Sequence, residues 1–169
     1  AVCPCVSRSG PAIGIAGGSG SGKTTLVNTF IHHHSGTTAL LSQDFYYFDR
    51  SSLYPEERAR TNFDCPDSID FERMARDLDE LAAGRPVGVP VYDFHNHVRM
   101  GKRSLLPGDL LIVEGTLILA VESIRSRLDY TVFLDAPESV RLERRIRRDR
   151  AERGRREDEI LRQYRETVR

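Results

Sequence analysis

Apolar residues follow two alternating patterns along this chain, short continuous runs and runs at helical spacing. Continuous apolar runs, which are typical of buried strands, lie at residues 12–16, 37–42, 109–115 and 130–135. Helical spacing occurs at residues 25–31, 69–83, 117–128, 137–154 and 157–168. This alternation predicts an α/β protein with a parallel, doubly wound sheet and helices on both faces.

Residue types at the ends of these segments refine their boundaries. Ser68 is a plausible N-cap for helix 69–83, and Gly84 ends that helix. The β-like run between Pro86 and Met100 contains two prolines, which favours an edge hairpin over a central strand. Pro137 is a good first residue for the arginine-rich helix that follows it.

One glycine-rich segment lies between the first strand and the first helix. Its residues match the pattern G-x-x-x-x-G-K-[ST] and read Gly17, Gly18, Ser19, Gly20, Ser21, Gly22, Lys23, Thr24 and Thr25. Glycines let backbone amides close around a polyphosphate, and the helix N-terminus adds positive potential. Lys23 is expected to reach the β- and γ-phosphates, and the Thr24 hydroxyl to hold Mg²⁺. The segment therefore predicts a phosphate-binding loop for ATP or GTP with Mg²⁺.

Length and composition limit the classes of protein. At 169 residues the chain is most simply a single domain, with residues 1–11 expected to form a disordered or tag-like terminus. Zero formal net charge gives no indication of a nucleic-acid or membrane partner, and no apolar stretch approaches the length of a membrane helix. Three cysteines, an odd number, favour reduced thiols in a cytoplasmic protein over a disulfide scaffold. The sequence leaves open whether the protein forms a homo-oligomer.

Two acidic residues follow strands, where ligands bind in open α/β sheets. Asp44 comes after strand 37–42, and Glu114 ends strand 109–115. The position of Asp44 alone fits two interpretations equally well: a turn residue, or an acceptor for the proton of a substrate hydroxyl. The guanine-reading pattern N-K-x-D of GTPases is absent from the chain. We therefore favour a kinase with a second, small substrate.

Nine arginines lie between Arg141 and Arg156. Arg145 and Arg148 share a helix face, and Gly154 interrupts the segment, so these arginines form a candidate lid over phosphates. A solvated, salt-bridged helix and a nucleic-acid patch are the alternatives, and the zero net charge weakens the second.

Several segments together resemble the uridine–cytidine kinase family. They are the phosphate loop, Gln43-Asp44-x-Tyr46-Tyr47, Asn62-Phe63-Asp64-x-Pro66-Asp67, Pro90-Val91-Tyr92-Asp93-Phe94 with His97, Val113-Glu114-Gly115, and Arg148-Asp149-x-x-x-Arg153-Gly154-Arg155. Their order and spacing fit from about residue 13 to residue 169. The resemblance implies an ATP-dependent kinase that phosphorylates the 5′-hydroxyl of uridine or cytidine, with a nucleoside-binding β-hairpin and an arginine-rich helical lid.

The resemblance also implies roles for single residues. Asp44 becomes the acceptor of the 5′-hydroxyl proton, and Lys23, Arg148 and Arg153 act on the phosphates. Asp64 is implied for the ribose hydroxyls, and Glu114 lies near Mg²⁺ with Thr24. The remaining residues implied to contact the nucleoside are Tyr47, Tyr92, Phe94, His97, Arg145, Arg155 and Gln163. Without the resemblance, Tyr92 and His97 are ordinary hairpin residues.

The sequence departs from the family pattern at two positions and at its end. Phe45 stands where relatives usually carry serine, and Cys65 where a histidine is common, so both are expected to alter nucleoside affinity or specificity. The strand and helix that the family carries beyond residue 169 are expected to be missing. Kinases of nicotinamide riboside, phosphoribulose or pantothenate are the alternative functions, together with a non-catalytic nucleotide sensor.

Overall fold

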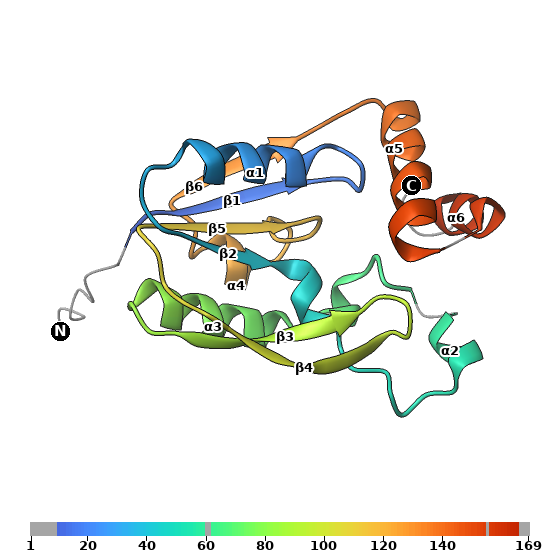
Figure 1. The fold of residues 1–169 in the computed structure, drawn as a ribbon, viewed down its shortest axis with the longest axis horizontal. Helices are drawn as coiled ribbons and strands as arrows, with labels where there is room; N and C mark the ends of the chain where they lie inside the picture. Colours follow the sequence, from blue (N-terminus) through green and yellow to red (C-terminus); the bar gives the residue numbers. More distant parts are fainter. Residues whose placement is uncertain (1–9, 60–61, 155, 166–169) are drawn as a thin grey trace.

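A four-stranded parallel sheet forms the centre of the molecule. The computed structural model describes residues 10–59, 62–154 and 156–165 (Figure 1). The strands are β1 (Ala12–Gly17), β2 (Thr38–Ser42), β5 (Leu110–Gly115) and β6 (Tyr130–Leu134), in the order β2-β5-β1-β6. Because all three strand pairs are parallel, their carboxyl ends meet at one edge of the sheet. The predicted parallel α/β sheet is confirmed.

Helices cover both faces of this sheet. Helix α1 (Lys23–His33) lies on one face, whereas α3 (Phe71–Ala82) and the one-turn α4 (Glu122–Arg125) lie on the opposite side (Figure 1). Alternate residues of β5 enter two separate cores: Leu110 and Ile112 pack in the cluster with Val27 of α1, and Leu111 and Val113 in the cluster with α3. The strand is therefore buried on both faces, as its continuous apolar run predicts.

Strand β6 differs from its prediction as a buried strand. Tyr130 and Phe133 each leave 65% of their surface exposed. β6 pairs only with β1 within the described part of the chain, so it forms an edge of the sheet. An apolar run reports β-propensity, but it does not report whether another element covers the strand.

The predicted hairpin forms, but it is a sheet of its own. Strands β3 (Val87–Asp93) and β4 (Val98–Leu105) pair antiparallel and do not extend the central sheet. Val87 and Val89 pack in the same core as α3. The hairpin is thus fixed beside the sheet, with its turn close to the carboxyl edge (Figure 1).

Two further boundaries differ from the sequence prediction. Asp70, and not Ser68, caps α3, because its carboxylate accepts a hydrogen bond of 3.1 Å from the Arg73 amide. The Ser68 hydroxyl instead donates to the carbonyl of Asn62, within a short 3₁₀ turn at Pro66–Ser68. Of the predicted helix 117–128, only α4 is an α-helix. Ile118, which precedes α4 and lies outside any helix, is buried in the core.

The remaining helices lie near the carboxyl edge of the sheet. They are α2 (Pro55–Ala59), α5 (Glu138–Arg153) and α6 (Glu157–Gln163). Pro137 occupies the N-cap of α5 and not its first turn, and α5 ends at Gly154, whose φ of 60° is left-handed. Within the described ranges, no helix has the length and apolar character needed to span a membrane.

Candidate functional site

The phosphate loop follows β1 directly and leads into α1, as the sequence predicts. Gly20 and Gly22 have φ values of 80° and 105°, in the region that favours glycine. A Cβ atom on Gly20 would lie 2.3 Å from the Arg141 carbonyl oxygen, so the loop also packs closely against α5. Gly22 is the N-cap of α1, which directs the positive end of the helix toward the loop. Thr24 and Thr25 follow in the first turn of α1.

Lys23 lies back against the loop. Its ammonium group donates hydrogen bonds of 2.8 Å and 3.0 Å to the carbonyls of Gly17 and Gly18. Burial lowers the pKa of Lys23, and the carboxylates of Glu114 and Asp44 act in the opposite direction. The loop therefore holds a cation against its own backbone, and a cation in this place suits a polyphosphate.

The two acidic residues lie at the carboxyl ends of neighbouring strands, Glu114 within β5 and Asp44 just after β2. Ser42 of β2 pairs with Glu114 of β5, and the Ser42 hydroxyl donates to the Glu114 carboxylate at 2.5 Å. Burial raises the pKa of Glu114, although the Ser42 hydrogen bond and Lys23 oppose that shift. Asp44 lies in the 3₁₀ helix Gln43–Tyr46 directly after β2, and its amide donates to the Ser42 hydroxyl at 3.3 Å. The Ser42 side chain thus connects both acidic positions.

A cleft brings these groups together. Its lining residues are Ser19, Lys23, Thr24, Asp44, Tyr47, Asp64, Glu114, Gly115, Thr116, Arg145 and Arg148. The Thr24 hydroxyl and the Glu114 carboxylate are oxygen donors that suit a hard cation. Among the described residues, no group of three or more His, Cys, Asp or Glu side chains is arranged to hold a metal ion. A cation here would therefore take further ligands from phosphate and water.

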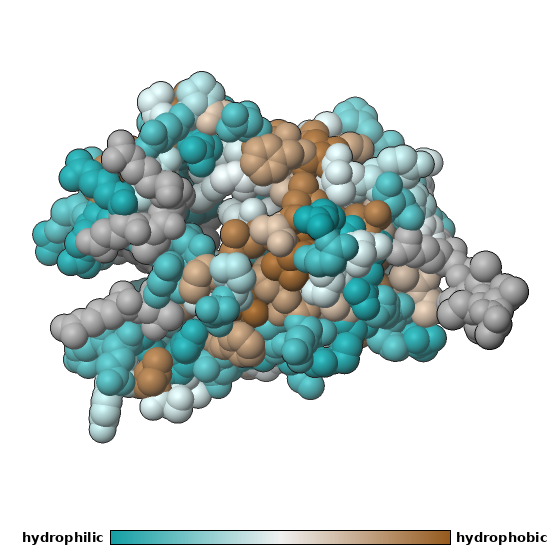
Figure 2. All heavy atoms as spheres, turned by 180° about the vertical axis from the view of Figure 1, so that it is seen from behind, coloured by the Kyte–Doolittle hydropathy of each residue, from teal (hydrophilic) through white to brown (hydrophobic). Residues whose placement is uncertain are grey.

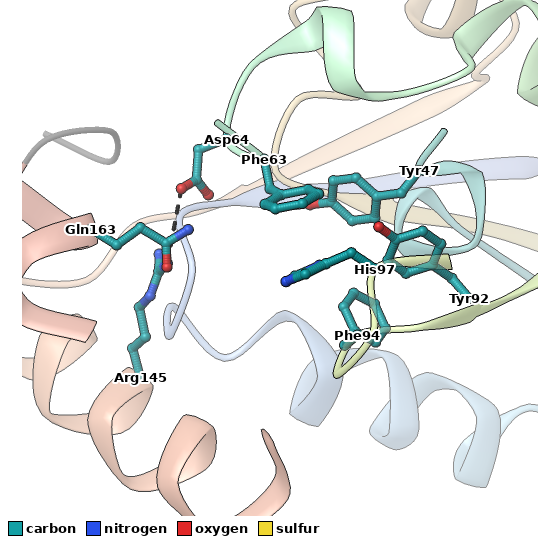
Figure 3. Close-up of a pocket in the computed structure, with 8 residues that line it drawn as sticks. All are labelled: Tyr47, Phe63, Asp64, Tyr92, Phe94, His97, Arg145 and Gln163. Atoms are coloured by element: carbon teal, nitrogen blue, oxygen red, sulfur yellow. Dashed lines mark hydrogen bonds and ion pairs between the residues drawn. The ribbon is translucent and has the colours of Figure 1, made fainter. Parts of the chain in front are cut away.

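An aromatic pocket lies beside the cleft (Figure 3). The Phe63 and His97 rings stack with centroids 4.3 Å apart. Tyr47 contacts the rings of Phe63, Tyr92 and Phe94 at centroid distances of 5.8, 5.2 and 6.0 Å. These side chains come from three separate segments of the chain and enclose one space. Such a space suits a flat, aromatic ligand.

Tyr92 supplies a polar atom in this pocket. Its hydroxyl is buried and has no hydrogen-bond partner within the described ranges. Burial raises the pKa of Tyr92 to about 12, so the phenol stays neutral near pH 7. A buried hydroxyl of this kind is expected to bond to a ligand.

Polar side chains form the opposite wall of the pocket. Arg145 is almost fully buried, and its Nη2 donates to Gln163 Oε1 at 3.0 Å and lies 3.9 Å from Asp64 Oδ2. Figure 3 shows Asp64, Arg145 and Gln163 facing the aromatic rings across the pocket. Tyr47, Asp64 and Arg145 line both the pocket and the cleft, so the two spaces are adjacent.

A buried carboxylate orients two of the arginines in α5. Asp149 is fully buried and accepts a hydrogen bond of 2.9 Å from Arg148 Nε. It also lies 3.8 Å from Arg145 Nε. Arg148 Nη2 lies 3.3 Å from the hydroxyl of Ser19 in the phosphate loop. The same helix thus presents one arginine to the pocket and another to the loop. From behind, Figure 2 shows a hollow beside the hydrophilic lobe formed by α5 and α6.

The structure places most of the predicted site residues around these two spaces. Arg155 lies outside the described residues, as does the side chain of Arg153. Phe45 and Cys65, the two departures from the family pattern, line neither space. The Phe45 ring instead contacts Arg103, at 4.5 Å from the guanidinium carbon.

Several residues in or near the site have a role that the sequence pattern does not predict. They include Phe63, Ser42 and Asp149. Arg144 Nη1 donates to the Gly20 carbonyl at 3.3 Å, and a Cβ atom on Gly18 would lie 2.2 Å from Arg141 Nη1. Helical spacing between residues 141, 144 and 148 is a signal that could have identified both arginines.

Comparisons with known proteins identify the family of this chain. Residues 12–169 match the phosphoribulokinase / uridine kinase family. Uridine kinase from Staphylococcus carnosus is 42% identical over 159 residues, which cover 93% of this chain and 76% of that protein. Uridine kinase from Streptococcus equi subsp. zooepidemicus is 40% identical over 158 residues, covering 92% and 76%.

Solved structures share the fold at lower identity. Phosphoribulokinase from Rhodobacter spheroides superposes with a TM-score of 0.66 at 19% identity, over 96% of this chain and 66% of that chain. D-glycerate 3-kinase from Cryptococcus neoformans superposes with a TM-score of 0.64 at 15% identity, over 90% and 74%. The family match and the identity to curated relatives confirm the resemblance seen in the sequence, and the chain belongs to the phosphoribulokinase / uridine kinase family.

Proposed function

We propose that this protein transfers the γ-phosphoryl group of ATP to the 5′-hydroxyl of uridine or cytidine and so forms UMP or CMP. The observation that carries this proposal is the adjacency of the phosphate-loop cleft and the aromatic pocket, which share Tyr47, Asp64 and Arg145. A nucleoside would fill the pocket with its base and reach the cleft with its primary alcohol. The curated relatives named uridine kinase support this substrate.

Asp44 is the proton acceptor in this proposal. It lines the cleft together with Lys23 and Arg148, at the carboxyl end of β2. A carboxylate in this place can accept the proton of the 5′-hydroxyl as the oxygen attacks the γ-phosphorus. Lys23, Arg148 and Arg153 would neutralise charge on the phosphate oxygens, because phosphoryl transfer depends mainly on positioning and electrostatic stabilisation.

Magnesium is the cation that we assign to the cleft. Thr24 and Glu114 would hold it, the latter through water, because their oxygen donors and the small number of acidic ligands fit an ion shared with phosphates. When bound, Mg²⁺ screens the charge of the β- and γ-phosphates. The loop residues 17–25 would hold the triphosphate itself through main-chain amides.

The pocket residues would select the nucleoside. Asp64 is an acceptor-only group that can bind both ribose hydroxyls, and Arg145 and Gln163 would support it from α5 and α6. The pyrimidine would lie among the aromatic rings, and Tyr92 and His97 would bond to its polar edge. Arg155 of the proposed arginine lid would contact the nucleoside. Gly154, whose left-handed backbone ends α5, would let that lid close. We further propose a single cytoplasmic kinase domain.

A panel of acceptors tests the proposed function. ADP release and product formation would be measured with uridine, cytidine, nicotinamide riboside, pantothenate, ribulose 5-phosphate and no acceptor. We expect kcat/KM for uridine or cytidine to exceed that of every other acceptor by at least about a hundredfold. Turnover with another acceptor at a similar rate, or no transfer to any nucleoside, would reject the proposal.

A substitution at Asp44 tests the proposed chemistry. Asp44→Asn keeps the size of the side chain but removes its basicity, so kcat on uridine is expected to fall by at least about a hundredfold while ATP binding stays nearly unchanged. Unchanged kcat would show that Asp44 is not the proton acceptor.

A further inference from the structure

One arginine connects the base-binding hairpin to the segment that carries Asp44. Arg99 lies in β4, two residues after His97, and pairs across the hairpin with Tyr92. Its Nε donates to the Tyr47 carbonyl at 2.8 Å, and its Nη2 donates to the Tyr46 carbonyl at 3.2 Å. The side chain is only 19% exposed. A guanidinium with two main-chain acceptors and this burial is a structural link, not a solvated surface charge.

The same guanidinium contacts a third segment. Its Nη2 lies 3.4 Å from the carboxylate of Asp70, the residue that caps α3. In addition, the Arg99 amide donates to the Asp49 carboxylate at 3.1 Å. The hairpin, residues 46–49 and the start of α3 therefore meet at one residue, Arg99.

A β-bulge accompanies this arrangement. Val91 pairs with Gly101, but Tyr92 pairs with Arg99, so Met100 has no counterpart on β3. Gly101 has a φ of 138°, and the Met100 side chain is 69% exposed. Bulges redirect the side chains next to them, often beside active sites. Here the bulge lies next to the residue that contacts the Asp44 segment.

Both ends of the link are held firmly. Asp44 is two residues before Tyr46, whose fully buried side chain donates to Asp77 at 2.8 Å. At the hairpin turn, the His97 amide donates to the Asp93 carbonyl at 2.8 Å, and His97 adopts a left-handed φ of 57°. A non-glycine residue in this conformation requires support from its surroundings. The hairpin and the Asp44 segment are therefore each held by contacts of their own. Arg99 joins the two through hydrogen bonds, beside the ring contacts of Tyr47 with Tyr92 and Phe94.

We propose that Arg99 is a positioning residue that keeps the base-binding hairpin in register with Asp44. This inference rests on the function proposed above. Arg99 lines neither the pocket nor the cleft, so it would act through Tyr92 and His97 on one side and through residues 44–47 on the other. A bound nucleoside spans both parts, and a shift of one relative to the other would move its 5′-hydroxyl away from the carboxylate. A misplacement of about 1 Å can reduce a rate by about a hundredfold.

Arg99→Gln tests this role, with Lys102→Gln as the matched control. Lys102 is an exposed cation on the same strand. We expect Arg99→Gln to lower kcat on uridine by about ten- to a hundredfold, while ATP affinity and slow ATP hydrolysis without nucleoside stay within about twofold. Arg99→Lys, which can still donate to one carbonyl, should recover part of the rate. Lys102→Gln should behave like the wild type.

Two results would overturn the proposal. The first is an unchanged kcat in Arg99→Gln. The second is an equal loss of nucleoside phosphorylation and nucleoside-independent ATP hydrolysis, because a general loss of structure would lower both.

A measurement without substrate separates this proposal from the proposed function. Amide hydrogen exchange in Arg99→Gln is expected to increase in residues 43–49 and 91–99 but not in β1 or α1. If the wild type phosphorylates no pyrimidine nucleoside, the proposed function fails, while the exchange result still decides whether Arg99 joins the two segments. Unchanged exchange in both segments would reject the link.

Discussion

The two halves of the candidate site are built in opposite ways. The phosphate loop consists of nine consecutive residues, Gly17–Thr25, and we propose that its main-chain groups and the end of α1 hold the phosphates. The aromatic pocket uses side chains from distant segments, including Tyr47, Phe63, His97 and Gln163. Local sequence therefore determines the first half almost completely, whereas the second half exists only after the hairpin, the sheet edge and α5–α6 have come together.

The largest expected effect is the loss of the loop lysine. Lys23→Met removes the cation beside the phosphates, so kcat should fall by at least about a thousandfold. If the two halves are separate, the dissociation constant for uridine should change by less than about threefold, as measured by calorimetry. An equal loss of uridine affinity would show that the halves do not bind independently.

A pair of glycine substitutions tests how strictly the loop is packed. Gly20 and Gly84 have similar φ values of 80° and 75°, but only at Gly20 would a Cβ atom meet the backbone of Arg141, at 2.3 Å. Gly84→Ala should destabilise the protein by about 1–2 kcal/mol through its left-handed φ alone. Gly20→Ala should lower the free energy of unfolding, measured with urea, by more than Gly84→Ala does. It should also lower ATP affinity by at least about tenfold. If the two substitutions changed stability and ATP affinity equally, the close packing of the loop against α5 would be contradicted.

Phe63→Ala tests the other half of the comparison. Removing the ring that stacks on His97 should raise the KM for uridine by about tenfold, because a base–aromatic stack contributes about 1–3 kcal/mol. ATP affinity should stay within twofold. Phe133→Ala, at an exposed ring of β6, serves as the control and should change neither constant. A matching loss of ATP affinity in Phe63→Ala would argue against separate halves.

The smallest effect is expected at Tyr46, a fully buried residue that lines neither half of the site. Burial, and then the hydrogen bond to Asp77, raise the pKa of Tyr46 far above its usual value. Because the protonated phenol is favoured in the folded protein, its contribution is complete below about pH 10 and is lost as pH rises above that value.

Tyr46→Phe should therefore lower the free energy of unfolding by about 1 kcal/mol at pH 7. It should also make the loss of stability above pH 10 less steep. The affinities for ATP and uridine should both stay within twofold. An unchanged slope above pH 10 would exclude Tyr46 as the titrating group.

The same contrast explains what the sequence could predict. The strands at 12–16, 37–42 and 109–115 and the conformation of the loop follow from local patterns, and the structure agrees with them. The exposure of β6 and the loss of helix 117–128 depend on which elements cover those residues, and no local pattern contains that information. Phe63 was missed for the same reason, since its partner His97 lies 34 residues further along the chain.

A crystal structure with uridine and a non-hydrolysable ATP analogue tests the central claim most directly. The account predicts that the base lies among Tyr47, Phe63 and Phe94, and that the 5′-oxygen lies within about 3.2 Å of the Asp44 carboxylate. A uridine bound outside the aromatic pocket, or an Asp44 side chain directed away from the 5′-oxygen, would contradict it.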